Sequence, residues 1–189
     1  SASMFHKFIQ ISGHLLKSTT NFCICRKTKY NKLRKNDLLA YTIGVKTFLE
    51  EFDRLGIVFG KPPIPPKWCL QNINFFGAYL AGIIDGDGSV CIRLLRRKNR
   101  KSYYQCRIQI FSSKEPLELK GAISTLLNCN VNLRKRELSR IIEGRKTEGI
   151  CYHAEFFVSR KNFELISNFI LSHMVMPKKR EHVQFYLDK

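Results

Sequence analysis

Acidic residues are scarce in this chain: 15 Asp and Glu stand against 33 Lys and Arg, for a formal net charge of +18 over 189 residues. A protein with so large a positive excess is expected to bind a polyanion, because each phosphate that a lysine or arginine neutralises releases counterions. Nucleic acid is the leading candidate for that partner, and an anionic membrane surface is the weaker one.

Long hydrophobic runs and paired metal-binding cysteines are also lacking. No apolar run reaches the ~20 residues that a bilayer span needs, and no signal-peptide pattern is visible, so no membrane partner is expected. Among the seven cysteines only Cys23 and Cys25 lie close together, whereas a structural zinc site needs two ligand pairs at regular spacing. We therefore interpret them as the reduced cysteines of an intracellular protein.

The proline-rich stretch "KPPIPPK", residues 61–67, predicts a stiff linker and a domain boundary, because it cannot continue a helix. Residues 1–67 are expected to form a basic N-terminal extension. It holds "RKTKYNKLRK", residues 26–35, with six basic residues and no acid, which suits a phosphate-contacting arm or a solvated loop. Apolar residues at helical spacing from Leu38 to Leu55 predict one amphipathic helix, with Asn36 or Asp37 as its N-cap.

Residues 68–189 predict an α+β domain with one four-stranded antiparallel sheet. The clearest strand alternates Cys106, Ile108 and Ile110 on an apolar face with Gln105, Arg107 and Gln109 on a polar face. Another strand is expected to bury Tyr152, Ala154, Phe156 and Val158, after a charged loop over residues 139–149. The expected order is a helix over 74–85 capped by Asn74, strands over 89–97 and 103–113, a helix over 114–128, strands over 131–138 and 151–159, a helix over 161–171 and a helix from Met176 with Pro177 in its first turn.

Small residues form a stripe along the first helix of this domain. Ala78, Gly82 and Gly86 lie four residues apart and share one face, which Ala81 and Asp85 adjoin. Such a stripe allows two helix backbones to approach closely, either between two subunits or inside one chain.

The same helix ends on Asp85-Gly86-Asp87-Gly88. Acids are disfavoured at a helix C-terminus, where the helix dipole is negative, so two of them in a cationic protein indicate a site for a hard divalent cation. If two such helices pack together, their acidic ends meet, and metals that bridge carboxylate and phosphate are a means of hydrolysing phosphodiesters.

The stretch "LAGIIDGDG", residues 80–88, resembles the signature of the LAGLIDADG homing endonucleases and departs from it only at Ile83 and Gly86. The resemblance covers residues 74–189 and implies the αββαββα core of that family. Members with a single motif per chain are homodimers whose motif helices pack at the centre. The resemblance therefore implies a homodimer with an interface at Ala78, Ala81, Gly82 and Asp85. Capping or supporting the helix end is the alternative role for Asp85.

The resemblance also implies the catalytic residues. Asp87 corresponds to the metal-binding catalytic carboxylate, the Gly86 carbonyl to a further metal contact, and the metal to Mg²⁺, which Mn²⁺ or Ca²⁺ can replace in binding. Lys114, or Ser113 in another register, corresponds to a polar residue near the scissile phosphate. Lys178, with Lys179 next, corresponds to a supporting lysine, although a solvated helix start is the alternative for Lys178.

The polar faces of the strands are expected to read duplex DNA in the major groove, since Arg pairs with guanine and Gln with adenine. A solvated sheet face is the alternative. The expected DNA-binding residues are Ser89, Cys91, Arg93, Arg97, Gln105, Arg107, Gln109, Arg134, Arg136 and Glu155, with Leu95, Phe111 and His153 on the same face.

We therefore expect a magnesium-dependent endonuclease that binds a long pseudo-palindromic double-stranded DNA target as a homodimer and makes a staggered double-strand break. An RNA-binding intron maturase without cleavage is one alternative, and a non-catalytic dimeric transcription factor is another. The two aspartates, Asp85 and Asp87, favour the enzyme. A composition rich in Lys, Asn, Ile and Phe favours a mitochondrion or plastid, and an archaeal or bacterial cytoplasm stays open.

Overall fold

The computed structural model describes residues 21–25, 38–42, 54–56, 63–97, 100–142 and 145–189. The chain divides into two compact units, Ser1–Leu55 and Gly56–Lys189, which we describe separately. The expected boundary within residues 61–67 stays a prediction. None of the helices in the described ranges is long and apolar enough to cross a bilayer.

In the first unit, β1 (Asn21–Cys25) pairs antiparallel with β2 (Leu38–Thr42), and Phe22 lies opposite Tyr41. The helix predicted from Leu38 is therefore wrong over its first five residues. Tyr41 and Thr42 favour strands, and the pairing with β1 outweighs the helical spacing of the leucines. The rest of that predicted helix up to residue 53, and the basic stretch 26–35, lie outside the described residues.

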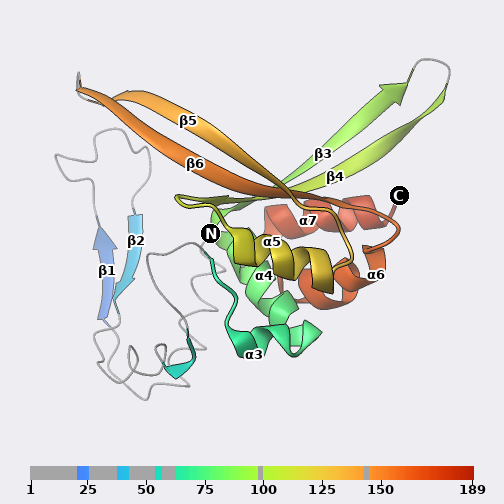
Figure 1. Ribbon diagram of the computed structural model, residues 1–189, viewed down its shortest axis with the longest axis horizontal. Coiled ribbons are helices and arrows are strands. Elements are labelled where there is room, and N and C mark those ends of the chain that lie inside the picture. The colour runs from blue at the N-terminus through green and yellow to red at the C-terminus, as the bar shows by residue number, and fades with distance from the viewer. Residues whose placement is uncertain (1–20, 26–37, 43–53, 57–62, 98–99, 143–144) are drawn as a thin grey trace. The chain divides into compact units, whose positions relative to one another are not determined.

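The second unit holds a four-stranded antiparallel sheet in the order β3-β4-β6-β5, covered on one face by helices (Figure 1). This confirms the predicted α+β fold. The strands are β3 (Gly88–Arg97), β4 (Arg100–Ser112), β5 (Asn132–Ile142) and β6 (Arg145–Val158). The helices are α3 (Lys67–Leu70), α4 (Ile73–Asp87), α5 (Leu117–Leu126), α6 (Phe163–Leu165), the π-helix η2 (Ile166–Ile170), the 3-10 helix η3 (Leu171–His173) and α7 (Pro177–Leu187).

The core lies between the sheet and the helices. As the alternation predicts, Cys106, Ile108 and Ile110 are fully buried, and they belong to one cluster with Phe76, Leu80 and Ile84 of α4 and Leu119 and Ile123 of α5. On β6, Ala154, Phe156 and Val158 are buried as expected, but Tyr152 is only half-buried. Tyr152 lies opposite Ser112, the last residue of β4, where the sheet narrows to two strands.

Two of the predicted element boundaries differ from those in the structure, and each difference has a physical reason. The charged loop expected over 139–149 is instead part of a long hairpin, whose pairing continues to Ile142 opposite Arg145. A two-stranded ribbon need not bury either face, so it shows no hydrophobic alternation in the sequence. The helix expected over 114–128 begins only at Leu117, because Pro116 is its N-cap, and it ends before Asn128, which has a φ of 47°.

The motif helix α4 is longer than predicted and starts from a different cap. Asn72, not Asn74, is the N-cap, and its Oδ1 accepts a hydrogen bond from the Asn74 backbone N–H at 2.8 Å. Gly77 of α4 lies against η2 so closely that a Cβ there would overlap the backbone carbonyl of Phe169. This contact brings the C-terminal helices up to α4.

Candidate active site and nucleic-acid interface

The junction between α4 and β3 has no connecting loop. α4 ends at Asp87, and β3 begins at Gly88, whose backbone N–H donates to the carbonyls of Ile83 and Ile84. A Cβ at Gly88 would lie 2.6 Å from the Ile84 Cα, so this close return of the chain requires glycine. Asp87 is therefore held between two regular elements, with its side chain exposed.

Asp85 has hydrogen-bond partners within its own subunit. It is only 4% exposed, and its Oδ2 accepts hydrogen bonds from the backbone N–H groups of Val175 at 2.6 Å and Met176 at 3.1 Å. These residues lead into α7. These bonds fix the start of α7 within one subunit and agree with the supporting role, while the expected position of Asp85 at a dimer interface stays a prediction.

A lysine of α7 caps α4 in return. Lys179 Nζ donates to the carbonyls of Ile84 at 2.7 Å and Asp85 at 2.8 Å, which are among the last carbonyls of the helix. Burial lowers the pKa of Lys179, while the nearby Asp85 and Asp87 act to raise it. A cation at this helix end is favourable because of the helix dipole.

Of the two lysines considered from the sequence, the structure brings Lys179 and not Lys178 to the end of α4. Lys178 is exposed and makes no hydrogen bond or ion pair within the described part of the chain. One residue along a helix corresponds to a rotation of ~100°, and this rotation turns Lys179 towards α4. The catalytic role expected for Lys178 stays a prediction without a structural contact.

A hollow of about 590 Å³ lies beside Asp87. Its polar lining includes Ser112 and Ser113 at the end of β4, but not Lys114, which is exposed and whose backbone N–H donates to Ser112 Oγ at 3.2 Å. The two serines therefore share a hollow with Asp87, and the catalytic role expected for Lys114, or for Ser113 in the other register, stays a prediction. The full lining is Pro63, Asp87, Phe111, Ser112, Ser113, Leu138, Ile150 and Cys151.

The donors at this hollow suit a hard cation. No group of three or more His, Cys, Asp or Glu converges anywhere in the described ranges, so a closed zinc-type site is absent there. The Asp87 carboxylate accepts no hydrogen bond from the residues that the structure describes, and it is exposed. A single free carboxylate fits Mg²⁺, which commonly binds one or two carboxylates together with substrate phosphates and keeps several waters.

The outer face of α4 carries the small-residue stripe. Ala78, Gly82 and Gly86 are exposed, and a Cβ at Gly82 or Gly86 would meet nothing within 4 Å. On the same helix Phe75 is 52% exposed, and its ring packs edge-on against Trp68 at 5.7 Å. The stripe is therefore open to a partner, whereas Ala81, expected at the same interface, is fully buried inside the subunit.

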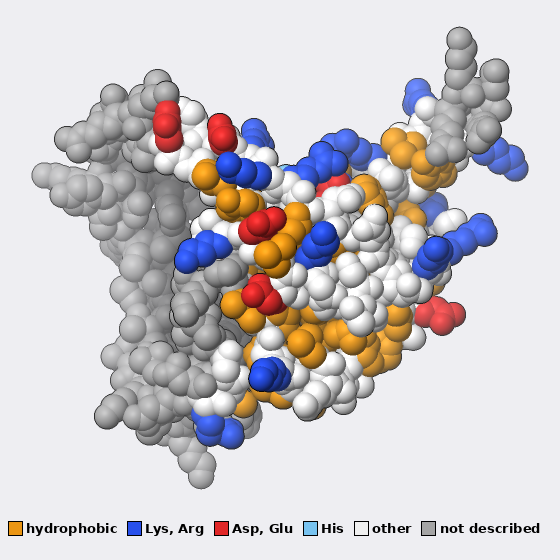
Figure 2. Space-filling model, in the orientation of Figure 1, with side chains coloured by type: hydrophobic (Ala, Val, Ile, Leu, Met, Phe, Trp, Pro, Cys, Tyr) orange, Lys and Arg blue, Asp and Glu red, His pale blue; other side chains and the backbone are white. Residues whose placement is uncertain are grey.

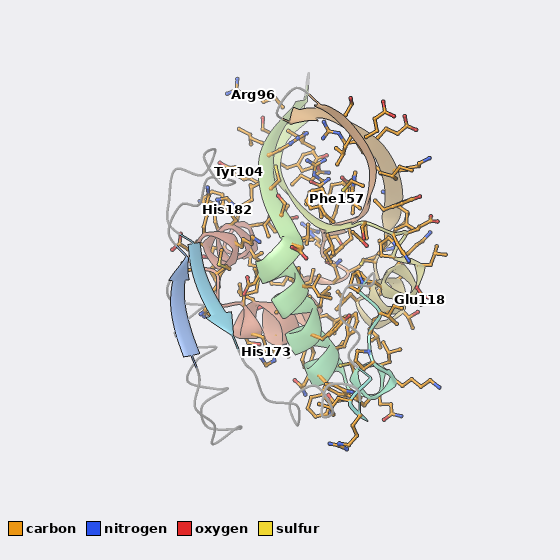
Figure 3. All side chains as sticks on the ribbon, turned by 90° about the vertical axis from the view of Figure 1, so that its left-hand side faces the viewer. Arg96, Tyr104, Glu118, Phe157, His173 and His182 are labelled. Carbon is orange, nitrogen blue, oxygen red and sulfur yellow. The ribbon has the colours of Figure 1, made fainter. Side chains whose placement is uncertain are left out.

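The polar residues of the strands share the sheet face opposite the helices, as expected. Antiparallel register places Ser89, Gln109, Glu155 and Asn132 in one row across all four strands. Figure 2 shows Lys and Arg side chains on the sheet side of this unit. In Figure 3 the strands curve around this face, and Phe157 lies on the inner side of the curve. The same face carries Cys91, Arg93, Gln105, Arg107, Arg134 and Arg136, while Arg97 ends β3 and its side chain is not described.

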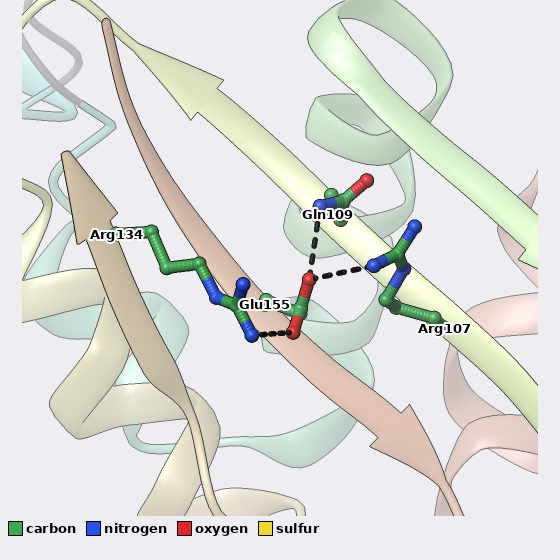
Figure 4. Close-up of polar contacts among 4 residues, drawn as sticks. All are labelled: Arg107, Gln109, Arg134 and Glu155. Carbon is green, nitrogen blue, oxygen red and sulfur yellow. Dashed lines mark hydrogen bonds and ion pairs between the residues drawn. The ribbon is translucent and has the colours of Figure 1, made fainter. Parts of the chain in front are cut away.

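Glu155 does not lie open on this face as expected. It is 1% exposed, and it pairs with Arg107 at 3.2 Å and Arg134 at 3.3 Å and accepts a hydrogen bond from Gln109 at 3.0 Å (Figure 4). The carboxylate is thus bound to three of the expected base-contacting side chains, and a DNA contact by Glu155 itself stays a prediction. No sequence pattern indicates this cluster, because its members come from three strands.

Comparison with known proteins agrees with this architecture. A family model described as LAGLIDADG endonuclease matches residues 80–185. None of the curated proteins compared with the chain matches it.

Several solved structures of homing endonucleases are similar to the chain. I-CvuI, in complex with its target in the presence of Ca, is 20% identical over 61% of this chain and 66% of its own, with a TM-score of 0.41. I-WcaI, bound to its DNA recognition sequence, is 14% identical over 97% of this chain and 71% of its own, with a TM-score of 0.49. I-LtrWI, bound to target DNA, is 17% identical over 58% of this chain and 35% of its own, with a TM-score of 0.34. Since the family model covers residues 80–185 of 189, from the motif helix to α7, the chain belongs to the LAGLIDADG endonuclease family.

Proposed function

We propose that the chain is a sequence-specific homing endonuclease that cuts both strands of a long, pseudo-palindromic DNA target and leaves a staggered break. The observation that carries the proposal is the exposed Asp87 carboxylate, held at the α4–β3 junction at the end of a basic sheet face. A free acid beside an excess of Lys and Arg has no evident structural use. It suits a metal-assisted reaction at a phosphate.

Asp87 would hold the metal, and the Gly86 carbonyl is the further contact that the family resemblance implies. When bound, Mg²⁺ supplies Lewis-acid stabilisation of the charge on the phosphate oxygens. Lys179 fixes the last carbonyls of α4 and brings a positive charge to the helix end that carries Asp87. The hydroxyls of Ser112 and Ser113 line the same hollow and can orient a water or a phosphate oxygen by hydrogen bonding.

Two copies are needed to cut two strands with one such carboxylate per chain. We propose that the α4 stripe of Ala78, Gly82 and Gly86 packs against its copy, because it is exposed, small and open to close approach. A twofold axis at α4 would bring the two Asp87 residues near each other and extend the two sheets in opposite directions along the duplex. This arrangement supports a pseudo-palindromic target.

The proposal is tested with Asp87→Asn, against Asp188→Asn as a matched control in the exposed last turn of the chain. Cleaved sites are first selected from a randomised DNA library with Mg²⁺ present. Asp87→Asn should abolish cleavage and keep DNA binding, because it removes the metal ligand and a negative charge facing phosphate. Asp188→Asn should cleave normally.

Normal cleavage by the Asp87→Asn variant would overturn the catalytic assignment. A wild-type protein that binds intron RNA and leaves every DNA unbroken would favour the maturase instead. One that binds DNA with Mg²⁺ present and never nicks it would favour the transcription factor.

A further inference from the structure

Glu155 is an acid in an unfavourable place. It lies in the central row of the sheet face proposed to meet a polyanion, and it is 1% exposed. Burying a carboxylate is costly unless it is paired and hydrogen-bonded. Its three partners meet that requirement, but an apolar residue would fill the same space without needing them. The presence of an acid at this position therefore calls for a role beyond packing.

The three partners come from the strands on either side of β6. Arg107 and Gln109 of β4 both donate to Oε2, and Arg134 of β5 pairs with Oε1 (Figure 4). A guanidinium has five N–H donors, so each arginine uses few of them here. Arg134 is 61% exposed, and much of its surface remains available to a ligand.

The contact also fixes the orientation of the Gln109 amide. Its Nε2 points to Glu155 at 3.0 Å, and its Oε1 points away, as Figure 4 shows. Adenine recognition by glutamine needs both an acceptor and a donor in defined positions. An amide held on one side by a buried acid presents these groups in one arrangement instead of two.

We infer that Glu155 is a positioning residue for sequence recognition: it holds Arg107, Gln109 and Arg134 as one pre-ordered unit, so that the base pairs they contact are read jointly. The inference rests on the proposed DNA-binding function. Ordering side chains before binding reduces the conformational entropy that association would otherwise cost. Neutralising part of the arginine charge also limits binding to phosphates of any sequence.

The test compares Glu155→Gln with Glu137→Gln. Glu137 lies on β5, is 84% exposed and pairs only weakly with Lys135 at 3.9 Å, so its variant makes the same charge change away from the three side chains. Binding is measured by titration in Ca²⁺ buffer on the selected target, on every single-base variant of it and on unrelated DNA.

Glu155→Gln should lose preference roughly tenfold at several neighbouring base pairs and bind unrelated DNA more tightly. Glu137→Gln should keep the wild-type preference. A purely structural role for Glu155 would instead weaken binding to all sequences equally, and that outcome, or an unchanged preference, would overturn the inference. If the wild-type protein binds no DNA sequence preferentially, the proposed function itself fails, and the two failures are thereby distinguished.

A second pair of variants tests the positioning role of Glu155 even if Glu155→Gln does not fold. Arg134 and Arg136 are both exposed, both on β5 and both on the same sheet face, but only Arg134 contacts Glu155. Arg134→Ala should change the preference at more than one base pair, because it also releases the Gln109 and Arg107 arrangement. Arg136→Ala should act at one base pair. An effect of Arg134→Ala confined to one base pair would overturn the inference.

Discussion

At the end of α4, two side chains of opposite charge each cap the other's helix. Asp85 of α4 accepts the backbone N–H groups that lead into α7, and Lys179 of α7 donates to the last carbonyls of α4. The Lys179 bond to the Asp85 carbonyl satisfies a backbone group that the helix end would otherwise leave unpaired, whereas the Ile84 carbonyl also accepts from the Gly88 N–H. These reciprocal contacts fix the helix end that carries Asp87. Their contribution to stability can be measured by substituting Lys179.

Lys179→Met should lower the free energy of unfolding by about 1.5–3 kcal/mol, the range for a hydrogen bond to a charged group. The neighbouring Lys178→Met is the matched control, and as an exposed substitution it should stay within about 0.5 kcal/mol of wild type. Urea denaturation of both variants measures the difference. Equal stabilities for the two variants would contradict the capping role of Lys179.

His153 provides a pH dependence on the sheet face. Burial lowers its pKa; Glu155 acts to raise it, and Arg134, Arg107 and Arg136 lower it further. Because the folded pKa lies below the unfolded value of about 6.5, the unfolded state binds more protons as the pH falls through that region. The stability due to neutral His153 is therefore present above about pH 6.5 and is lost below it.

We accordingly expect the melting temperature to fall between pH 7.5 and pH 5.5, and to fall less in His153→Gln. His173→Gln, at the exposed end of η3, is the control and should keep the wild-type fall. Differential scanning calorimetry over this range measures both. A decrease of the same size in His153→Gln and wild type would contradict the assignment.

At the scale of single residues, the sequence predicted well which face of a strand or helix a residue occupies. It predicted poorly which other residues that residue contacts. Strand alternation placed Arg107, Gln109 and Arg134 correctly, because the period of a strand is fixed by its backbone. It could not show that Glu155 lies beneath them, since the partners are brought together only by the order of the strands. The choice between Lys178 and Lys179 likewise depended on the rotation of α7 against α4.

At the scale of elements, Gly77 determines how closely α4 packs against η2. Gly77→Ala should destabilise the protein by roughly 1–3 kcal/mol, the usual cost of overpacking, because the added methyl would overlap the Phe169 carbonyl and must displace backbone. Gly121→Ala is the matched control: Gly121 also lies in a helix, and a Cβ there meets nothing within 4 Å. The Gly121→Ala variant should have a free energy of unfolding up to about 1 kcal/mol higher than that of the wild type. Guanidinium unfolding curves test both variants. An unchanged stability of Gly77→Ala would show that η2 can shift to make room for the methyl group.

The helices and strands that the sequence predicted well are those with a buried face. α4, β4 and β6 carry the residues of the core, and their periodicity reflects that burial. The outer part of the β5–β6 hairpin, over residues 139–149, and the strand from Leu38 were missed because neither has an apolar pattern of its own period. Their structure depends on backbone pairing between segments, which local sequence does not display.

At the scale of the whole molecule, the exposed stripe on α4 determines the proposed assembly. Gly82→Leu should abolish the dimer, since the change occurs in both copies at once and forces the two helices apart. The folded monomer should survive, because Gly82 is exposed and a Cβ there meets nothing within 4 Å in one subunit. Light scattering with circular dichroism separates these effects. A wild type that is monomeric both free and on its DNA target would rule out the dimer.

The alternation of the strands also has an evolutionary consequence. Residues that stabilise the fold and residues that face the proposed ligand occupy opposite sides of the same backbone, so mutations on the outer face leave Ile108 and Ile110 untouched. Positions such as Cys91, Arg93 and Gln105 can therefore drift one at a time, and a lineage can follow a changing target by single substitutions. Around Glu155 the same drift is blocked, because a change in one partner disturbs two others. We expect new specificities in descendants of this protein to arise first away from that cluster.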